Sequence, residues 1–397
     1  MNPRSFFNDI HAIAAKGKSF DKMRRYIIFA YKLTARTFKF RSQTMSGMKK
    51  SANVPLRTAT AWIAFATIFL LAFTVGTSGN DSASRPSRKI QVIFDTDICD
   101  DIDDTWALAL LLQSPEFDVK LVTTAVGNTA SKAKTVAKFL EIAGRTDIPI
   151  GIGVKQRDGS HRQDAWAKDY KLSSYPGTVY EDGVKALIDT VMNSRRRIKV
   201  VAVGPLPNIA AALEREPRIA EKAEFVGMHG SVRLGYGGSK KISAEYNVKA
   251  FAKGAQKVFT APWKMTITPL DTCGLVQLKG NKYQKVLKRN SPLTRALMEN
   301  YRAWHKQGLR NSNKDLSEAE LSKKVDQKLN SSSSTLFDTV AIYLAMSSEL
   351  VKMEKLGIKV TDDGYTRIDE RAKVIKCATA WKDLGAFEDY LVDRLTK

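Results

Sequence analysis

A cluster of carboxylates follows directly after a short apolar stretch near residue 95. The segment QVIFDTDICDDIDDTWALALLL covers residues 91–112, and six aspartates fall within ten of its residues: Asp95, Asp97, Asp100, Asp101, Asp103 and Asp104. Carboxylates this close repel one another, so their pKa values rise unless a cation or hydrogen-bond donors stabilise the charges. At the end of a strand and the start of a helix, such a cluster predicts a metal site in an α/β crevice. A solvated acidic turn is the alternative.

The elements that must position this cluster alternate between strands and helices. Apolar runs typical of strands cover 90–96, 119–126, 148–154, 198–204 and 223–230, and helical spacing covers 105–114, 130–144, 182–194 and 208–223 between them. This alternation predicts βαβ units and a mostly parallel sheet. Further along we expect a helix at 250–261, a strand at 263–270, a helix-rich region over 283–328 and an apolar helix after Ser331–Ser334. Two strands, 355–369 and 371–382, should form a terminal ribbon.

Polar residues follow four of the expected strands. They are the aspartate cluster, Gly127–Asn128, Gly204–Asn208 and Met228–Ser231. The carboxyl ends of parallel strands share one edge of a sheet, and ligands bind at that edge. The sequence therefore predicts that these four groups converge on one site.

Charge and cysteine content narrow the function classes. The net charge is +23 over 397 residues, and residues 1–57 hold 13 Lys/Arg against 2 Asp/Glu. A basic chain attracts phosphates and nucleic acid, but no aromatic-interleaved basic motif is present, so we expect no nucleic-acid partner. Cys99, Cys273 and Cys377 lack CxxC spacing, which predicts neither a disulfide framework nor a zinc site.

The N-terminal segments predict a targeting function. Residues 59–75 are apolar and uncharged, with Lys49, Lys50 and Arg57 before them and small polar residues after them. With initiation at Met48 or Met45, residues 48–79 are typical of a signal peptide; with initiation at Met1 they would be a membrane anchor. We expect a basic extension over 1–47, a linker over 80–88 and a catalytic domain over 89–397. Both alternatives predict export, periplasmic or secreted, or attachment to a membrane through the N-terminal segment alone.

Two other acidic motifs place aspartates at comparable spacing. A DxD such as Asp95-Thr96-Asp97 also opens the site of haloacid-dehalogenase-type phosphatases, which need a downstream acidic pair at another strand end. The one later adjacent pair, Asp362–Asp363, falls in an expected hairpin turn. An EF-hand is excluded because Asp100 stands at the glycine position and Trp106 at the bidentate acid.

The string DTDICDDIDDTWALAL resembles the inosine-uridine-preferring nucleoside hydrolase family, including a variant with two extra residues in this loop. Four later segments resemble that family in the same order: TTAVGN, VAVGPLPNIAAAL, SAEYNVKAFAKGAQKVFTA and LFDTVAIYLA. The resemblance covers about 88–397. It implies one α/β domain in which helices flank a mostly parallel, mixed central sheet.

The resemblance also implies a cofactor, Ca²⁺, which suits carboxylate and carbonyl oxygens. By position its ligands would be Asp97, Asp104, Asp338 and the backbone carbonyl oxygen of Pro207, with Asp101 a rival or additional ligand. Asp338 can also be interpreted as the N-cap of the following helix, and one residue can serve both as N-cap and as metal ligand.

By the same resemblance, Asp97 would be the general base for a water molecule that attacks the anomeric carbon. The substrate would be a nucleoside or related ribosyl compound, and relatives that form dimers or tetramers make a homo-oligomer one expected state. The substrate-binding residues implied by position are Asp103, Asn128, Glu245 and Asn247, with Met228 and His161 as further candidates.

Two departures from the family pattern raise alternatives. By the resemblance, Cys99 replaces a loop glycine, and Phe337 replaces a histidine that many members have and that can protonate the leaving base in purine-active members. His161 and His229 are candidate substitutes for that acid, and Trp166, Tyr170 and Tyr175 are candidate stacking residues or packing residues. A non-catalytic, Ca²⁺- and ribosyl-binding protein of the same fold remains the alternative to an enzyme.

Overall fold

A ten-stranded mixed sheet forms the centre of the protein, in the order β4-β3-β2-β1-β5-β6-β7-β10-β8-β9. The computed structural model describes residues 88–156 and 158–397. The strands are β1 (Ile90–Thr96), β2 (Phe117–Thr124), β3 (Ile150–Ile152), β4 (Val179–Tyr180), β5 (Ile198–Ala202), β6 (Ala223–Met228), β7 (Lys264–Thr268), β8 (Val351–Val360), β9 (Thr366–Ile368) and β10 (Val374–Trp381). Neighbours from β4 to β10 pair in parallel, while β8 is antiparallel to both β10 and β9.

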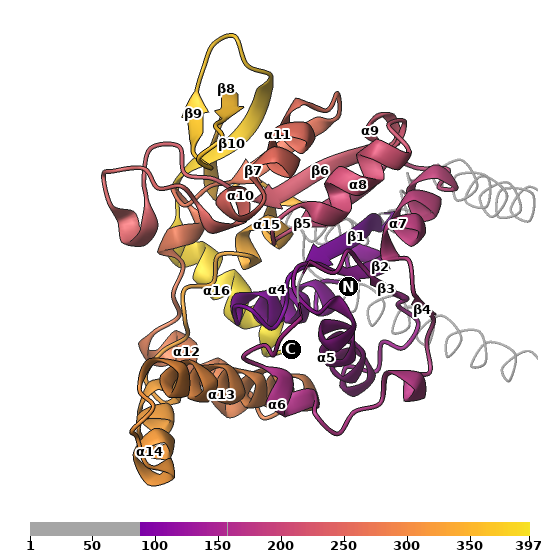
Figure 1. Cartoon of the computed structure of the whole chain (residues 1–397). Coiled ribbons are helices and arrows are strands. Elements are labelled where there is room, and N and C mark those ends of the chain that lie inside the picture. The colour runs from indigo at the N-terminus through magenta and orange to yellow at the C-terminus, as the bar shows by residue number, and fades with distance from the viewer. Residues whose placement is uncertain (1–87, 157) are drawn as a thin grey trace, which may run out of the picture. The chain divides into compact units, whose positions relative to one another are not determined.

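Strand β1 lies where the order of the sheet reverses. It pairs in parallel with β2 on one side and β5 on the other, as Figure 1 shows at the centre of the fold. From β2 the sheet continues to β3 and β4 on one side, and from β5 it continues to β6 and β7 on the other side. At such a switch in strand order a crevice opens beyond the carboxyl ends of the strands. The aspartate cluster follows β1 and therefore lies at this crevice.

Helices cover both faces of the sheet. Those of ten or more residues are α4 (Asp103–Leu112), α5 (Thr129–Ile142), α7 (Gly183–Met192), α12 (Gly280–Arg289), α13 (Pro292–Ser312), α14 (Glu318–Leu329) and α16 (Leu384–Leu395). Shorter ones include α6 (Asp164–Ala167), α8 (Pro207–Arg215), α9 (Ile219–Lys222), α10 (Tyr246–Ala250), α11 (Ala252–Thr260) and α15 (Thr339–Leu344). One apolar core includes residues of α4, α5, α13, α15 and α16, and a second includes residues of α7, α8 and α11.

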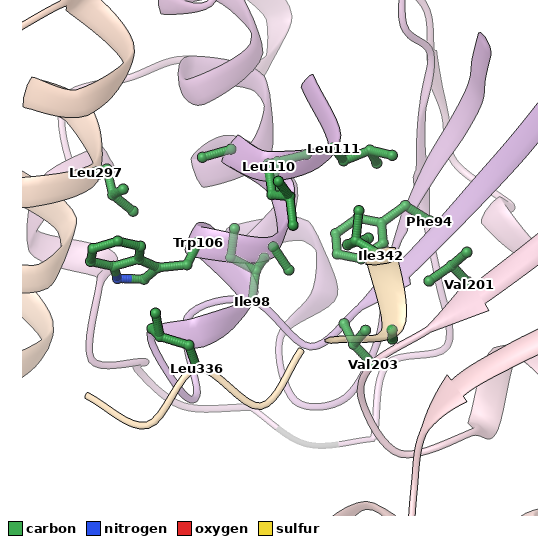
Figure 2. Packing of buried hydrophobic residues seen from close by; sticks show 14 of the residues in the cluster. Phe94, Ile98, Trp106, Leu110, Leu111, Val201, Val203, Leu297, Leu336 and Ile342 are labelled. Carbon is green, nitrogen blue, oxygen red and sulfur yellow. The ribbon is translucent and has the colours of Figure 1, made fainter. Parts of the chain in front are cut away.

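Helix α4 is buried on all sides, which explains its unbroken apolar sequence. All ten of its residues except Leu112 are buried, and it packs against α13, α15 and α16. Figure 2 shows Trp106 of α4 beside Leu297 of α13 and near Leu336. A helix that is apolar all round has no solvent face to orient it, so packing on several sides fixes its position. The two acids of its first turn, Asp103 and Asp104, are fixed with it.

The structure confirms most of the expected elements and corrects three. The helix expected over 208–223 is two helices, α8 and α9, because Pro217 between them has no N–H to continue the hydrogen-bond ladder. The terminal ribbon has three strands rather than two, and β10 also joins the main sheet beside β7. The sequence interpretation did not include the C-terminal helix α16.

The expected turn at Asp362–Asp363 is confirmed between β8 and β9, where the Gly364 N–H donates to the carbonyl of Thr361. Asp362 is exposed there and pairs with Lys253 at 2.8 Å.

The predicted extension, the signal or anchor segment and nearly all of the linker lie outside the described residues. Within the described part of the chain, no helix combines the length and the apolar character needed to cross a membrane.

Candidate functional site

A cavity of about 410 Å³ opens beside the carboxyl ends of the central strands. It has an acidic floor, a group of polar side chains on one wall and aromatic rings toward its mouth. Its lining residues are Asp97, Asp100, Asp101, Asp103, Asp104, Ser160, His161, Arg162, Val203, Met228, Tyr236, Glu245, Tyr246, Asn247, Asn311, Phe337 and Asp338. The structure thus brings together most of the residues singled out from the sequence.

Three carboxylates form the floor of this cavity. One oxygen each from Asp103, Asp104 and Asp338 lies within 4.8 Å of the others, and all three residues are buried. The first two come from the first turn of α4, and Asp338 directly precedes α15. The N–H of Asp338 donates to Asp103 at 3.3 Å, and the Thr96 hydroxyl donates to Asp104. These contacts hold the carboxylates in place without neutralising them.

The electrostatics of this floor fit a hard cation. Burial and mutual repulsion raise the pKa of Asp103, Asp104 and Asp338 well above the ordinary value. Within the described residues, none of the three is in an ion pair with a lysine or arginine. Buried carboxylates are normally paired or bound to a metal, and an all-oxygen donor set suits Ca²⁺ or Mg²⁺. The three residues therefore fit a divalent cation.

Asp97 lies beside the floor, at the end of β1. Its carboxylate approaches the backbone of Gly204 so closely that a Cβ there would lie 2.4 Å from Oδ1. Burial raises the pKa of Asp97 to about 7, with the nearby Lys132 ammonium lowering it. Asp97 is outside the group of three carboxylates that lie within metal-binding distance. A buried carboxylate beside a cation site is suited to accept a proton from water.

The inserted acids of the loop have separate roles. Asp100 binds the buried ammonium of Lys132 at 2.9 Å and the Nδ1 atom of His161 at 2.8 Å. Its carbonyl oxygen accepts from the Trp304 indole at 3.2 Å. Asp101, by contrast, is an exposed residue that lines the cavity, and its carboxylate accepts from the N–H of Ile102 at 2.7 Å. Asp100 is thus the carboxylate that pairs with the buried Lys132 and His161, and Asp101 faces the cavity.

Cys99 adopts the backbone conformation that its position requires of glycine. Its φ is 82°, in the left-handed region, where a Cβ costs roughly 1–2 kcal/mol. The side chain is buried, and burial raises the pKa of its thiol to about 12. Cys99 is therefore a packed, unreactive side chain on strained backbone.

His161 lines the cavity, but both of its ring nitrogens are engaged. Nδ1 contacts the Asp100 carboxylate, and Nε2 accepts from the N–H of Asn128 at 3.2 Å. The carboxylate requires a proton on Nδ1, and the amide requires a lone pair on Nε2, so this pattern defines a neutral tautomer. Gly127 makes the contact sterically possible, because a Cβ there would lie 2.5 Å from the ring. The imidazole has no free N–H to offer a leaving group.

Glu245 and Asn247 project from the start of α10 into the cavity. The Glu245 carboxylate accepts from the N–H groups of Gly230, Asn247 and Val248 at 2.7–3.2 Å. Burial raises the pKa of this carboxyl to about 7 despite those donors. The Asn247 amide donates to the carbonyls of Val203 and Met228 at 2.7 and 3.1 Å. Both side chains are thereby held rigidly beside Met228, as a hydroxyl-binding group requires.

Two predicted residues lie apart from the cavity lining. Asn128 is the N-cap of α5, where its Oδ1 accepts from the N–H of Ser131 at 3.1 Å. Pro207 is the first residue of α8 and is buried. Neither residue is among the described residues that line the cavity. Their predicted contacts with sugar and cation stay predictions.

The other ring candidates belong to the packing. His229 is fully buried, donates from Nε2 to Gly204 O at 3.0 Å, and has its pKa lowered to about 4 by burial. Trp166 and Tyr170 donate to Glu299 and Glu141, and Tyr175 donates to the carbonyl of Ile148. None of these four residues lines the cavity, and the contacts of Trp166, Tyr170 and Tyr175 agree with the packing alternative.

The sequence interpretation missed several cavity residues. Tyr236, Tyr246, Arg162 and Asn311 all line the cavity. Tyr246 stands between two predicted sugar-binding residues and could have been found by that position. Tyr236 lies in a GYGG turn and Asn311 near the end of α13, where no motif points to the site.

Comparisons with known proteins agree with this geometry. Residues 92–385 match the family profile of the inosine-uridine preferring nucleoside hydrolases. A probable uridine nucleosidase of Arabidopsis thaliana is 29% identical over 182 residues, and the alignment covers 43% of this chain and 56% of the relative. A pyrimidine-specific ribonucleoside hydrolase of Citrobacter koseri is 27% identical, with 53% and 69% covered. The first of these alignments thus spans little more than half of the curated relative.

Solved structures share the fold. A plant nucleoside hydrolase superimposes with a TM-score of 0.63 at 22% identity, over 77% of this chain and 99% of the other. A purine-preferring ribonucleoside hydrolase from Gardnerella vaginalis gives 0.61 at 20% identity, over 77% and 98%. The profile match spans most of the chain and includes the aspartate loop, Glu245, Asn247 and Asp338. The chain belongs to the inosine-uridine preferring nucleoside hydrolase family.

Proposed function

We propose that this protein hydrolyses the N-glycosidic bond of ribonucleosides to give ribose and a free base, with Ca²⁺ as its cofactor. The observation that carries the proposal is one cavity that holds a tri-carboxylate floor, a separate buried carboxylate at Asp97, and the hydroxyl-binding pair Glu245 and Asn247. A protein that only binds a sugar needs Glu245 and Asn247 but no general base. Hydrolysis also requires a base beside the cation site, and Asp97 is placed to be that base.

The residues divide into tasks under this proposal. Asp104 and Asp338 would hold the cation, with Asp103 beside them, and a bound Ca²⁺ would lower the pKa of a coordinated water. Asp97 accepts the proton of the attacking water. Asp103, Glu245 and Asn247 bind ribose hydroxyls and fix the sugar. The carboxylates around the anomeric carbon stabilise the positive charge that develops as the C1′–N bond breaks.

The related proteins support a nucleoside as the substrate. The Arabidopsis relative is named a probable uridine nucleosidase, and the Citrobacter relative a pyrimidine-specific ribonucleoside hydrolase. Both names specify the same bond and the same sugar, which agrees with the hydroxyl-binding side chains here.

Ribose release from uridine and inosine, with Ca²⁺ or with chelator, tests the proposal. We expect release by the wild type, its loss on chelation, and a decrease of 10²–10⁴-fold in Asp97→Asn. Asp95→Asn is the discriminating variant, because Asp95 would be the nucleophile of a phosphatase. Cleavage of p-nitrophenyl phosphate that depends on Asp95 would establish the phosphatase instead. Ca²⁺ binding without release from any nucleoside would establish the binding protein.

For the residues before 88, we propose an export signal that starts at Met48. A positive start, an apolar run and a small polar segment support this proposal. N-terminal sequencing of the protein from its host distinguishes cleavage near residue 79 from a retained anchor.

A further inference from the structure

Tyr236 presents a phenol to the cavity with its proton unused. It lies in a short turn, Tyr236–Gly238, and its side chain lines the cavity. The hydroxyl oxygen accepts from the N–H of Tyr246 at 2.9 Å. Because this contact uses a lone pair, it leaves the hydroxyl hydrogen available, and the described residues supply no acceptor for it. A phenol in this state is a hydrogen-bond donor.

The hydroxyl lies beside the segment that carries the sugar-binding residues. The amide that holds it belongs to Tyr246, which stands between Glu245 and Asn247 in the chain. Those neighbours contribute the two polar side chains that we assign to ribose. A donor anchored at this amide is therefore next to the residues that we assign to the sugar.

The Tyr236 ring packs on the residue that replaces the family histidine. Tyr236 and Phe337 meet edge to face, with ring centroids 6.1 Å apart and planes at 83°. Phe337 directly precedes the floor residue Asp338. The pair thus forms an aromatic wall in which one member lacks a donor and the other carries one.

The histidines near the cavity are held by the protein, and Arg162 stacks on an aromatic ring. His161 has both nitrogens engaged, and His229 lies outside the lining. The guanidinium of Arg162 lies over the Trp304 ring at 5.0 Å from its centroid. Tyr236 therefore has the combination of cavity exposure, anchoring and a free proton.

We propose that Tyr236 is the donor to the departing base, in place of an imidazole at position 337. The inference rests on the proposed hydrolysis. As the C1′–N bond breaks, its electron pair moves onto the base, and the Tyr236 proton passes to that base. Water attacks C1′ and gives its proton to Asp97. Solvent then returns a proton to the phenolate of Tyr236, a residue that is 44% exposed as a whole, and the proton on Asp97 leaves to solvent.

The environment keeps this donor protonated. Burial of the hydroxyl end raises the pKa of Tyr236 above its ordinary value, and the neighbouring Glu245 carboxylate adds to the effect. The phenol is thus neutral at physiological pH. An acid of this kind assists leaving groups that need a proton and makes little difference to those that depart as stable anions.

The test compares leaving groups in Tyr236→Phe. For uridine we expect kcat/KM to fall about 10²-fold, chiefly in kcat. For p-nitrophenyl β-D-riboside, whose leaving group departs unaided, we expect a change of less than about threefold. Retained turnover of the aryl riboside also demonstrates that the variant is folded. Tyr180→Phe is the matched control, because Tyr180 is equally exposed at 44% but outside the cavity lining.

A series of substituted phenyl ribosides gives the second measurement. Against leaving-group pKa, log kcat/KM should fall more steeply in Tyr236→Phe than in the wild type. Equal slopes, or equal losses on uridine and the aryl riboside, would mean a structural role and overturn the assignment. Unchanged uridine turnover would overturn it as well. Failure of the proposed hydrolysis is distinct, since the wild type would then cleave neither substrate.

Discussion

The ammonium group of Lys132 donates a hydrogen bond to the main-chain carbonyl of Asp97 at 2.7 Å. The same nitrogen contacts the Asp100 carboxylate at 2.9 Å, and the lysine is fully buried. One cation therefore fixes the backbone of the proposed base and balances the charge of the inserted acid. It joins α5 to the loop after β1.

Removing this cation should destabilise the protein. Lys132→Met removes one partner of the largely buried Asp100 carboxylate, so we expect a loss of up to about 3 kcal/mol in the free energy of unfolding, measured by urea denaturation. The double variant Lys132→Met/Asp100→Asn should recover part of that loss. Lys134→Met, on the same helix but only half-buried, is the control. A loss as large in the control would refute a specific role for the buried pair.

Gly204→Ala should impair catalysis without unfolding the protein. The new methyl would lie 2.4 Å from Asp97 Oδ1, so the carboxylate must move. A displacement of about 1 Å can cost 10²-fold in rate, and we expect a decrease of that order in kcat. Gly385→Ala at the start of α16, where φ is not left-handed and the nearest atom to a Cβ would lie 3.4 Å away, should retain full activity. Equal kcat values for the two variants would contradict the proposed role of the Asp97–Gly204 contact.

Ca²⁺ should stabilise the folded protein. A ligand at 100 times its Kd that binds only the folded state adds about 2.7 kcal/mol, which thermal unfolding with Ca²⁺ or with chelator can detect. Asp338→Asn should reduce the increase in Tm, while Asp189→Asn, which removes an exposed partner of Lys185, should not. An identical increase in both variants would place the cation elsewhere.

In the presence of chelator, stability should fall as the pH rises from about 4 to about 7. Burial raises the pKa of Asp95 to about 6 and that of Glu245 to about 7. The folded state then keeps protons that the unfolded chain has released, so each group lowers stability by up to about 1.4 kcal/mol per pH unit within its window. His229, with its pKa lowered to about 4, opposes this trend because its stabilisation disappears below about pH 6.5.

Urea denaturation at a series of pH values measures this slope. Glu245→Gln should flatten it between about pH 4.5 and 7. A slope unaffected by that substitution would show that Glu245 is not protonated in the folded state.

Glycine should be better tolerated than alanine at position 99. Neither has the thiol, so the comparison isolates the Cβ at a φ of 82°, and Cys99→Gly should exceed Cys99→Ala in stability by about 1 kcal/mol. At Ala137 in α5 the order should reverse, because glycine costs about 1 kcal/mol in a helix. Thermal unfolding of the three variants and the wild type decides; the same order at both positions would argue against left-handed backbone at Cys99.

The sequence predicted the elements around the site well, because their signals are local. The apolar run of β1 and the aspartates after it place Asp97, Asp103 and Asp104 directly. Asp338 needed the family resemblance, since more than 230 residues separate it from the loop. The helix break at Pro217 was present in the sequence but was outweighed by the helical spacing on both sides.

The environment of each side chain could not be predicted in the same way. Whether His161 is free to act as an acid depends on Asp100 and on the N–H of Asn128, which come from two other segments. Tyr236 has an ordinary turn sequence, and its relation to Phe337 is tertiary. Residue type indicates what chemistry is available, while hydrogen-bond partners decide whether it can be used.

The buried network of Lys132, Asp100 and His161 also constrains how this loop can evolve. Deleting the two inserted residues removes the Asp100 carboxylate from the buried ammonium, and replacing the lysine first removes one partner of a largely buried carboxylate. Each single substitution gives a less stable protein, so the three residues must change together or with a compensating substitution elsewhere. The longer loop is therefore expected to be inherited as a block, and its presence would mark a lineage within the family.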